Sequence, residues 1–449
     1  MKAELLERYA DRPLPRYTSY PTAPHFGPME AGLYRQWLSE IPAGEPLSLY
    51  LHLPFCRSMC WYCGCHTTIT ARSEPITRYL AALHREIELV GQAIPDRRLA
   101  RHVHFGGGTP TLIKPAQFTE LMAHLRSAFV IDDACEVAIE IDPRTLSQAM
   151  INALGAGGVT RASLGVQSFD PVVQKAINRV QSQEQTAAAT EALRDAGIGR
   201  INFDLIYGLP HQTEASCVET VRQAVAMAPD RFAVFGYAHV PGFKLHQRKI
   251  DEAALPDAAA RHRQAEAIAD ALVDAGYVRV GLDHFARPDD TLTLAQLAGT
   301  LHRNFQGYTT DACQTLIGLG ASSIGRLPQG YVQNAVLIGD YQRRIAEDSL
   351  AVSKGREFAP EDRLRGAVIE RIMCDYRVDL DGLCRAFGAD AGELIDSATG
   401  LDQLFADGVA RRSGSLIEVD DGARPLVRLL AAAFDQYLGQ GTTRHSRAI

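Results

Sequence analysis

The sequence predicts an α/β protein whose parallel sheet curls into a partial barrel of six strand–helix units, a partial (β/α)6 barrel. Six short apolar, β-rich runs lie at 47–53, 101–105, 136–141, 161–166, 200–206 and 231–238. Helical patterns lie between them, at 76–94, 115–129 and 184–197. Strands that alternate with helices favour right-handed βα units and a parallel sheet. In such a barrel the chemistry takes place at the carboxyl ends of the strands.

Three segments are predicted along the chain. Residues 1–45 form an N-terminal arm that looks irregular, because seven prolines between positions 13 and 46 interrupt any long helix. Residues 46–355 form the catalytic domain with the partial barrel. Residues 356–449 form a small, mainly helical domain that resembles a winged-helix domain, with a probable hairpin at 408–419 and a last helix at 424–438. It carries no clear basic recognition helix, so we do not infer DNA binding.

Composition indicates an ordinary globular protein. The 449 residues are 46% apolar and 22% charged, and 46 basic against 53 acidic side chains give a formal net charge of −7. No global basic field therefore points to nucleic acid. The amino terminus lacks the apolar segment of a signal peptide, and no run of 18 apolar residues can span a membrane. We expect a cytoplasmic enzyme, possibly monomeric, in a compartment where clustered thiols serve metal or redox chemistry.

Four of the nine cysteines lie within ten residues, directly after the first predicted strand, in YLHLPFCRSMCWYCGC (50–65). They are Cys56, Cys60, Cys63 and Cys65. A structural zinc site normally joins two knuckles separated by a longer loop, and no second knuckle exists here. A thioredoxin-like dithiol would use Cys60 and Cys63 and leave Cys56 idle. An iron–sulfur cube held by three cysteines would leave one iron open to a substrate or cofactor.

The C-x3-C-x2-C spacing after the first strand of a βα barrel resembles the radical S-adenosylmethionine (SAM) superfamily. The resemblance implies that Cys56, Cys60 and Cys63 bind a [4Fe–4S] cluster and that Tyr62, the aromatic residue before the third cysteine, contacts SAM. SAM would chelate the open iron and yield a 5′-deoxyadenosyl radical. The protein's part would be to bind, to orient and to exclude side reactions. Cys65 is a surplus thiol whose role stays open.

Polar or glycine-rich signals follow the other strands. Consecutive glycines in HFGGGTPT (104–111) let a backbone approach a ligand, and we expect their N–H groups to bind the amino-acid end of SAM. Glu140 ends the third strand and is expected to bind a cationic or hydroxyl group, unless EIDP is only a helix-entry turn. Gln167 ends the fourth strand. Asp204 lies inside an apolar strand, where a carboxylate needs a partner or ligand.

The whole chain resembles the oxygen-independent coproporphyrinogen III oxidases, a radical-SAM family of haem biosynthesis. The matching segments fall in one order from residue 16 to the last residue. They are RYTSYPTA (16–23), 50–65, HFGGGTPT (104–111), EIDP (140–143), GVQSFD (165–170), NFDLIYGLP (202–210), GYAHVP (236–241), QRKI (247–250), GLDHFARPDDTL (281–292), LHRNFQGYTT (301–310) and HSRAI (445–449).

This resemblance implies two SAM molecules in one site. The residues that would contact the SAM on the cluster are Tyr50, Gly107, Glu140 and Ile324. The residues that would contact the second SAM are Tyr62, Gly108, Thr109, Gln167, Arg179, Asp204 and Ala238. Taken alone, Arg179 would instead be read as a solvated helix residue.

The implied reaction is the oxidative decarboxylation of the ring A and B propionates of coproporphyrinogen III to the vinyl groups of protoporphyrinogen IX. It needs an electron donor for the cluster and an electron acceptor, and the sequence identifies neither. The alternative is a non-enzymatic haem chaperone that shares the fold. That relative is shorter and usually lacks the fourth cysteine, the RYTSYPTA arm and the HFARPDD…NFQGYTT region (284–310), all of which are present here.

A substrate with four carboxylates predicts a cationic pocket, for which bidentate arginine contacts are well suited. The candidates are Arg16, His284, Arg287, His302, Arg303 and the basic tail around Arg444 and Arg447. The competing interpretation is that Arg287 and Arg303 only pair with nearby acids such as Asp283 or Asp289.

Overall fold

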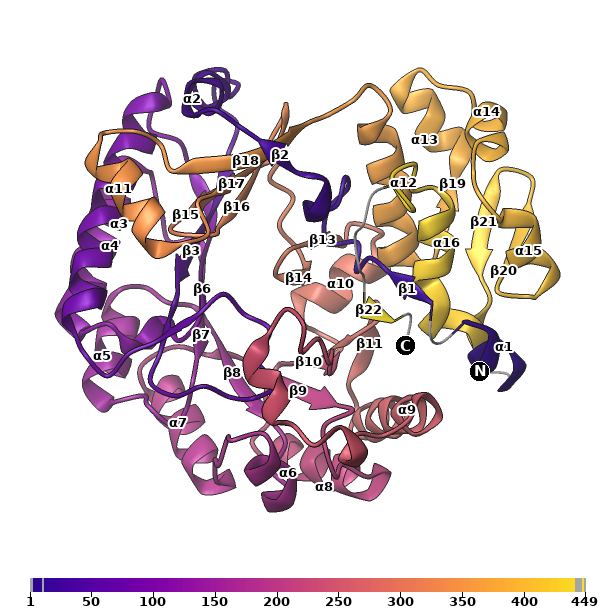
Figure 1. The fold of residues 1–449 in the computed structure, drawn as a ribbon, viewed down its shortest axis with the longest axis horizontal. Coiled ribbons are helices and arrows are strands. Elements are labelled where there is room, and N and C mark those ends of the chain that lie inside the picture. Colours follow the sequence, from indigo (N-terminus) through magenta and orange to yellow (C-terminus); the bar gives the residue numbers. More distant parts are fainter. Residues whose placement is uncertain (1–2, 10–11, 441–445, 448–449) are drawn as a thin grey trace.

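The computed structural model describes residues 3–9, 12–440 and 446–447. Six parallel strands form the curved wall of an open barrel (Figure 1), which confirms the predicted fold class. They are β3 (Leu47–Leu53), β6 (Ala100–Gly107), β7 (Glu136–Ile141), β8 (Arg161–Gln167), β9 (Arg200–Tyr207) and β10 (Arg231–Gly236). Each of these strands pairs in parallel with the next, as right-handed βα units require.

Helices cover the outer face of this wall. They are α3 (Glu74–Ala93), α4 (Pro115–Ala128), α5 (Gln148–Ala156), α6 (Pro171–Ala176), α7 (Gln183–Asp195), α8 (Glu214–Val225) and α9 (Ala258–Asp274). Side-chain caps start several of them, such as Ser182 before α7 and Thr213 before α8. Because both faces of the sheet are covered, every residue of β3 is buried except Tyr50, which is half-buried.

Further strands extend the sheet to thirteen, in the order β11-β12-β10-β9-β8-β7-β6-β3-β15-β16-β17-β18-β2. Sequence analysis did not predict this extension. Next to β3 lie β15 (Thr315–Leu319), parallel to it, then the antiparallel β16 (Ile324–Leu327), β17 (Gly330–Asn334), β18 (Val352–Glu357) and β2 (Gly27–Pro28). At the other edge lie β12 (His284–Ala286) and β11 (Val278–Val280). Short elements complete this part: β4 (Phe55–Cys56), β5 (Thr68–Ile69), α10 (Thr291–Leu297), β13 (His302–Asn304), β14 (Gly307–Thr309) and α11 (Ile338–Ala346).

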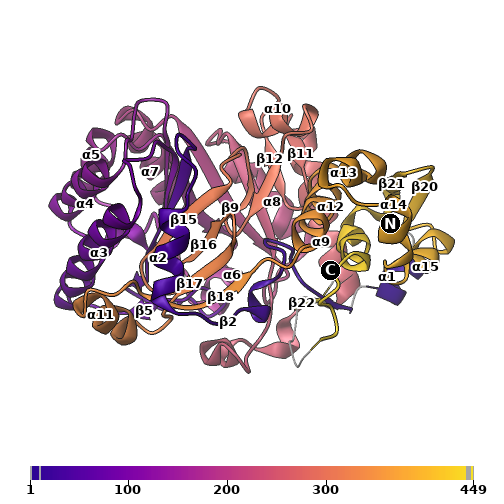
Figure 2. The same cartoon turned by 90° about the horizontal axis from the view of Figure 1, so that it is seen from above.

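The C-terminal region is mainly helical, and its element order is the one expected for a winged-helix-like fold. It contains α12 (Asp362–Asp375), β19 (Arg377–Asp379), α13 (Leu380–Phe387), α14 (Ala391–Asp396), α15 (Leu401–Ala406), β20 (Ala410–Ser413), β21 (Leu416–Val419) and α16 (Val427–Ala433). Its three strands form one small antiparallel sheet in the order β19-β21-β20. Viewed from above, this region lies beside the barrel rather than on its helical face (Figure 2).

The N-terminal arm is more ordered than its prolines predicted. It contains α1 (Ala3–Tyr9), β1 (Pro13–Leu14) and α2 (Ala31–Ser39), since α2 fits between Pro28 and Pro42 without a break. The arm is shared between two hydrophobic cores. Tyr34 and Trp37 of α2 join the core of the barrel, whereas Leu5, Tyr9 and Leu14 join the core of the C-terminal region. β1 also pairs with β22 (Ser446–Arg447) near the carboxyl terminus. Within the described ranges, no helix is both long and apolar enough to cross a bilayer.

Candidate active site

The cysteine loop leaves the carboxyl end of β3 and is fastened by backbone contacts from two other segments. Ile177 accepts a hydrogen bond from Trp61 N at 2.9 Å, and Asn178 donates to the Met59 carbonyl at 2.8 Å. The loop after β10 adds Lys244, which donates to the Cys65 carbonyl at 3.0 Å, and His246 Nε2, 2.7 Å from the Cys63 carbonyl. These bonds hold the loop's backbone while leaving the sulfur atoms to other partners.

Hydrogen-bond donors surround the first two predicted cluster ligands. Thr67 donates to Cys56 Sγ at 3.2 Å, and Thr109 donates to the same sulfur at 3.5 Å. Arg144 and Arg179 point N–H groups at Cys60 Sγ, at 3.5 and 3.6 Å. Donors of this kind stabilise the thiolate, which is the form that binds metal.

Cys63 and Cys65 interact with each other. A hydrogen bond from Cys65 lowers the pKa of the Cys63 thiol, which favours its thiolate form. The same hydrogen bond raises the pKa of the Cys65 thiol, which acts as the donor. Cys63 therefore offers a thiolate sulfur to a metal, and Cys65 is the hydrogen-bond donor to that sulfur.

The spacing of the three thiols suits a multi-iron cluster better than a single ion. One zinc ion with bonds of about 2.3 Å would need thiolate sulfurs about 3.8 Å apart. Among the described residues, Cys56, Cys60 and Cys63 do not form a set of ligand atoms all within 4.8 Å of one another. This spacing does not match a mononuclear zinc site, and thiolates with hydrogen-bond donors around them are the ligands that an iron–sulfur cluster takes.

The glycine turn after β6 packs against the cysteine loop. A Cβ atom on Gly108 would lie 2.6 Å from both the Phe55 carbonyl oxygen and Thr67 Oγ1, so only glycine fits there. Gly107 has a φ of +117°, which also favours glycine.

The backbone N–H groups of this turn are used within the protein, which corrects the expectation that they are open to a ligand. Gly108 N donates to the Leu53 carbonyl at 2.9 Å, and Thr109 N donates to the Phe55 carbonyl at 2.8 Å. Gly107 N donates to Glu140 at 3.2 Å. The glycines bring two strand ends together and leave space beside them, rather than presenting a nest of free donors.

Glu140 and Tyr50 form a polar group at the ends of β7 and β3. Glu140 Oε1 lies 3.3 Å from His104 Nε2, and the Tyr50 ring stacks on His104 with centroids 5.8 Å apart. Burial alone would raise the pKa of Glu140, but His104 and the N–H of Gly107 hold it below its ordinary value. Glu140 is therefore an ionised carboxylate beside the cysteine loop, and it attracts a cation.

Arg179 is buried, which corrects its reading as a solvated helix residue. Its guanidinium donates to the Gly165 carbonyl at 2.7 Å and lies 3.4 Å from Asp142, and Asp142 also pairs with Arg144 at 2.7 Å. Gln167 ends β8 with a φ of +68°, a conformation that few non-glycine residues adopt. Backbone strain of this kind is typical of positions that present a side chain to a ligand.

Asp204 lies inside β9, where Ser163 donates to one carboxylate oxygen at 3.0 Å and Asn202 to the other at 2.8 Å. Burial, with the charge of Glu140, raises the pKa of Asp204 to about 7. The hydrogen-bond partners of Asp204 are thus neutral side chains. Within these hydrogen bonds of the described residues, no cation compensates the charge of its carboxylate.

The other predicted SAM contacts lie around the same opening. Tyr62 packs with Ile177 and Tyr237, and the Ala238 carbonyl follows β10 and accepts from Gln247 at 3.2 Å. Ile324 starts β16, and its carbonyl lies 2.8 Å from the place that a Cβ on Gly318 would take. Gly318 on β15 pairs with Tyr50 on β3, so Ile324 on β16 lies two strands away from Tyr50.

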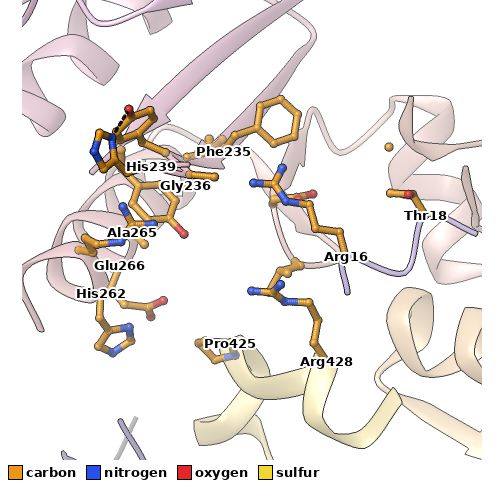
Figure 3. A pocket seen from close by; sticks show the side chains of 18 of the residues that line it. Arg16, Thr18, Phe235, Gly236, His239, His262, Ala265, Glu266, Pro425 and Arg428 are labelled. Carbon is orange, nitrogen blue, oxygen red and sulfur yellow. Dashed lines mark hydrogen bonds between the residues drawn. The ribbon is translucent and has the colours of Figure 1, made fainter. Parts of the chain in front are cut away.

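A cavity of about 750 Å³ opens beside the carboxyl end of β10 and extends toward the C-terminal region. Figure 3 shows Arg16 from the arm and Arg428 from α16 reaching into it, opposite Phe235, Gly236 and His239. Five arginines line it against three acids, Glu252, Glu266 and Asp283. The arginines are Arg16, Arg261, Arg279, Arg303 and Arg428.

Comparison with known proteins identifies the chain's relatives. The model of the radical SAM superfamily matches residues 50–224. An oxygen-independent coproporphyrinogen III oxidase of Bradyrhizobium diazoefficiens is 58% identical over 100% of both chains, and one of Paracoccus denitrificans is 44% identical over 98% of this chain and 97% of its own. The solved coproporphyrinogen III oxidase (HemN) of Escherichia coli, described as a radical SAM enzyme, is 35% identical with a TM-score of 0.91, and the match covers 97% of this chain and 99% of that one.

The chain belongs to the oxygen-independent coproporphyrinogen III oxidase family. It therefore belongs to a radical SAM family, whose cofactors are a [4Fe–4S] cluster and SAM. The family that the cysteine loop and the ordered matching segments predicted is confirmed.

The structure brings two of the five predicted substrate residues of this oxidase family into the arginine-lined cavity, namely Arg16 and Arg303. His284 lies behind it, with Nδ1 2.8 Å from Asp283. His302 lines a second cavity of about 450 Å³ and contacts Glu370 at 3.2 Å. Arg287 lies at the opposite, amino end of β10, where its guanidinium contacts the carbonyls of Ala228 and Pro229. Arg444 and the Arg447 side chain lie outside the described residues.

Sequence reasoning missed Arg428, although a signal was present. Arg428 is the one charged residue in the apolar stretch 426–434, and a charge in such a stretch needs a buried partner or a ligand. Burial and the neighbouring Arg16 and Arg303 lower the pKa of Arg428 to about 10. Three cations from distant segments are thus held together, an arrangement that an anionic ligand would relieve.

Proposed function

We propose that this protein catalyses the oxidative decarboxylation of the ring A and B propionates of coproporphyrinogen III, giving the two vinyl groups of protoporphyrinogen IX. Full-length similarity to named oxidases supports the reaction class. The observation that carries the substrate assignment is the arginine-lined cavity beside the strand ends. A tetracarboxylate is the kind of ligand that a cavity with more arginines than acids recognises.

Cys56, Cys60 and Cys63 would hold the [4Fe–4S] cluster. When bound, the cluster and SAM supply the 5′-deoxyadenosyl radical that removes hydrogen from a propionate β-carbon. The chain's own residues prepare this site. Thr67, Thr109, Arg144 and Arg179 donate to the sulfurs of Cys56 and Cys60 and stabilise their thiolates. Cys65, which donates to Cys63, is proposed to tune that ligand rather than to replace it.

Two SAM molecules are also part of the proposal. Tyr50, Gly107, Glu140 and Ile324 would contact the first, and ionised Glu140 suits its amino group. Tyr62, Gly108, Thr109, Gln167, Arg179, Asp204 and Ala238 would contact the second. What supports the proposal is that the two sets are neighbours, since Glu140 of the first lies close enough to Asp204 of the second to raise its pKa. Equilibrium dialysis of the cluster-loaded protein should give two SAM per chain, falling toward one in Gln167→Ala.

Arg16, Arg303 and Arg428 would bind propionate carboxylates of the substrate. The side chains of Arg303 and Arg428 are buried and Arg16 is exposed at the mouth of the cavity, so a bound carboxylate meets cations that are already in place. Arg303 Nε and Nη1 are buried without a hydrogen-bond partner in the described part of the chain, although Nη1 lies 3.8 Å from Asp283, which is the ion pair of the competing interpretation. After hydrogen abstraction, each reacting propionate would lose its carboxylate as CO2 and pass one electron to an external acceptor, so that a vinyl group stays on the ring; the acceptor, like the donor, is a separate molecule.

The domain division at 45 and 355 and a cytoplasmic location are proposed with the function. Two separate hydrophobic cores support the second boundary, since one runs to Val352 and the other starts at Leu364 within the later half of the chain. The nine cysteines are all free thiols, which suits a reducing compartment. A monomer is the simplest state that fits these features.

The decisive experiment is an anaerobic assay of the cluster-loaded protein with SAM, a reductant, coproporphyrinogen III and a cell extract as electron acceptor. Product is measured as protoporphyrin fluorescence after oxidation. We expect product that requires SAM and disappears in Cys56→Ser, whereas Cys313→Ser, away from the loop, keeps it. Haem binding with SAM cleavage but no product would instead assign the protein to the haem chaperones and contradict the proposed reaction.

A further inference from the structure

We infer a binding site for a divalent transition-metal ion between the outer helices α3 and α4, formed by His84, Glu120 and His124. Each of these residues offers one ligand atom, and the three atoms all lie within 4.8 Å of one another. No other group of three such residues with this spacing occurs in the described ranges. The site belongs to the helical layer outside the sheet and uses none of the residues assigned to the cluster, SAM or substrate.

The helical spacing explains why these side chains meet. Glu120 and His124 are four residues apart on α4, so both project from the same face. α3 packs beside α4, and the rings of His84 and His124 lie with their centroids 4.2 Å apart. Glu88, one turn after His84 on α3, places Oε1 4.0 Å from His124 Nε2. Each helix thus supplies one imidazole and one carboxylate at i and i+4.

The two imidazoles are prepared to bind a metal through their lone pairs. His124 Nδ1 lies 3.3 Å from the Glu120 backbone carbonyl, and donation to it leaves the lone pair on Nε2. His84 Nδ1 is buried and has no hydrogen-bond partner among the described residues, an arrangement that normally costs free energy.

The ligand set selects the class of ion. Two imidazoles and a carboxylate suit Zn²⁺, Co²⁺ or Ni²⁺, whereas Ca²⁺ and Mg²⁺ prefer oxygen ligands. Glu120 is exposed, so water can complete the coordination. Glu88 is a weaker candidate for the fourth position, because Arg85 already donates to its other oxygen at 2.8 Å. An ion in this place links two neighbouring helices and stabilises the folded chain by mass action.

The test uses the cluster-loaded, chelator-washed full chain with Co²⁺ and then Zn²⁺ as probes. We expect one Co²⁺ per chain, with ligand-field absorption typical of nitrogen and oxygen ligands and without thiolate charge-transfer bands. Zn²⁺ should displace it and raise the thermal unfolding midpoint. His84→Ala, His124→Ala and Glu120→Gln should each weaken binding by about tenfold or more. The control is His211→Asn, an exposed histidine elsewhere whose left-handed backbone asparagine tolerates.

Two outcomes would overturn the inference. One is wild-type protein that binds no Co²⁺ or Zn²⁺ at millimolar concentration. The other is binding that survives in both histidine variants, or that shows thiolate bands, which would place the ion on a cysteine. Unfolding of each variant without metal is measured first, and His124→Gln replaces any variant that does not fold. Because no readout depends on product formation, the result is independent of the proposed reaction.

Discussion

Charged side chains are paired differently at the amino ends and at the carboxyl ends of the barrel strands. At the amino ends, β7, β8, β9 and β10 each begin with a charged residue, and these residues pair with nearby charges. Glu136 accepts from Arg161 at 3.2 Å and from Arg200 at 3.1 Å, and Arg231 pairs with Asp290 at 2.7 Å. At the carboxyl ends Asp142 pairs with Arg144 and Arg179, but Asp204 has only neutral hydrogen-bond partners. The amino end is built for stability and the carboxyl end for ligands.

The mismatch at the carboxyl end is visible in individual residues. Asp204 is buried near the acid Glu140 with only neutral donors, and burial raises its pKa to about 7. Arg428 lies among other arginines, and its pKa falls to about 10. Such positions cost stability in the free protein and become favourable when a ligand of opposite charge arrives.

The largest expected effect is at the cysteine loop. Cys60→Ser removes one predicted cluster ligand together with the sulfur that Arg144 and Arg179 face. We expect loss of the cluster's visible absorption and of all detectable product, with an unchanged far-UV circular dichroism spectrum. Retention of a full cluster in this variant would show that Cys65 can take the place of Cys60 and would contradict the ligand assignment.

Asp204→Asn should stabilise the protein while impairing its function. In the unfolded chain Asp204 ionises near pH 3.8, and in the folded protein near pH 7, so the folded state holds the extra proton between these values. Its contribution therefore lowers the free energy of unfolding as pH rises from about 4 to 7, by an upper bound of about 4 kcal/mol. The Asn variant should lose this slope in urea titrations at several pH values and bind SAM more weakly. If the free energy of unfolding changed with pH in the Asn variant as it does in the wild type, the raised pKa assigned to Asp204 would be contradicted.

The corresponding change at the amino ends of the strands, Asp290→Asn, should destabilise the protein and leave its function unchanged. Asp290→Asn keeps the cap of α10, where Asp290 accepts from Leu292 N, but it leaves Arg231 buried beside a neutral side chain. Breaking a buried pair in this way costs about 3 kcal/mol. We expect a lower midpoint in chemical denaturation and no change in the KM for coproporphyrinogen III. A changed KM with unaltered stability would reverse the comparison between the two ends.

The smallest effect is expected for substrate binding. Arg428→Gln should raise the KM for coproporphyrinogen III roughly 10- to 100-fold, because a charge-assisted hydrogen bond contributes about 1.5–3 kcal/mol. SAM cleavage without substrate should not change. Arg424→Gln serves as the control, since Arg424 is exposed and pairs with Asp421. Arg287→Gln, at the amino end, should leave the KM unchanged, and an equal rise there would contradict the cavity as the carboxylate site.

The sequence predicted the parts of this site that depend on local pattern. The six strands were predicted within a few residues, because apolar runs alternate with helical periods, and the four clustered cysteines follow the first strand in the chain itself. Long-range pairing was beyond reach. No local pattern shows that Gly318 pairs with Tyr50 and so places Ile324, or that Gly108 N is taken by Leu53. Arg428 reaches the cavity only because α16 packs beside the arm.

Order of synthesis is a further consequence of the arm's shared packing. Leu5, Tyr9 and Leu14 precede the barrel in the chain, whereas the core that receives them is formed by residues 364–437, which follow it. The barrel segment between them has its own core and can fold while translation continues. We therefore expect the cysteine loop to be in place before Arg16 and Arg428 meet, so that the cofactor pocket forms before the substrate cavity.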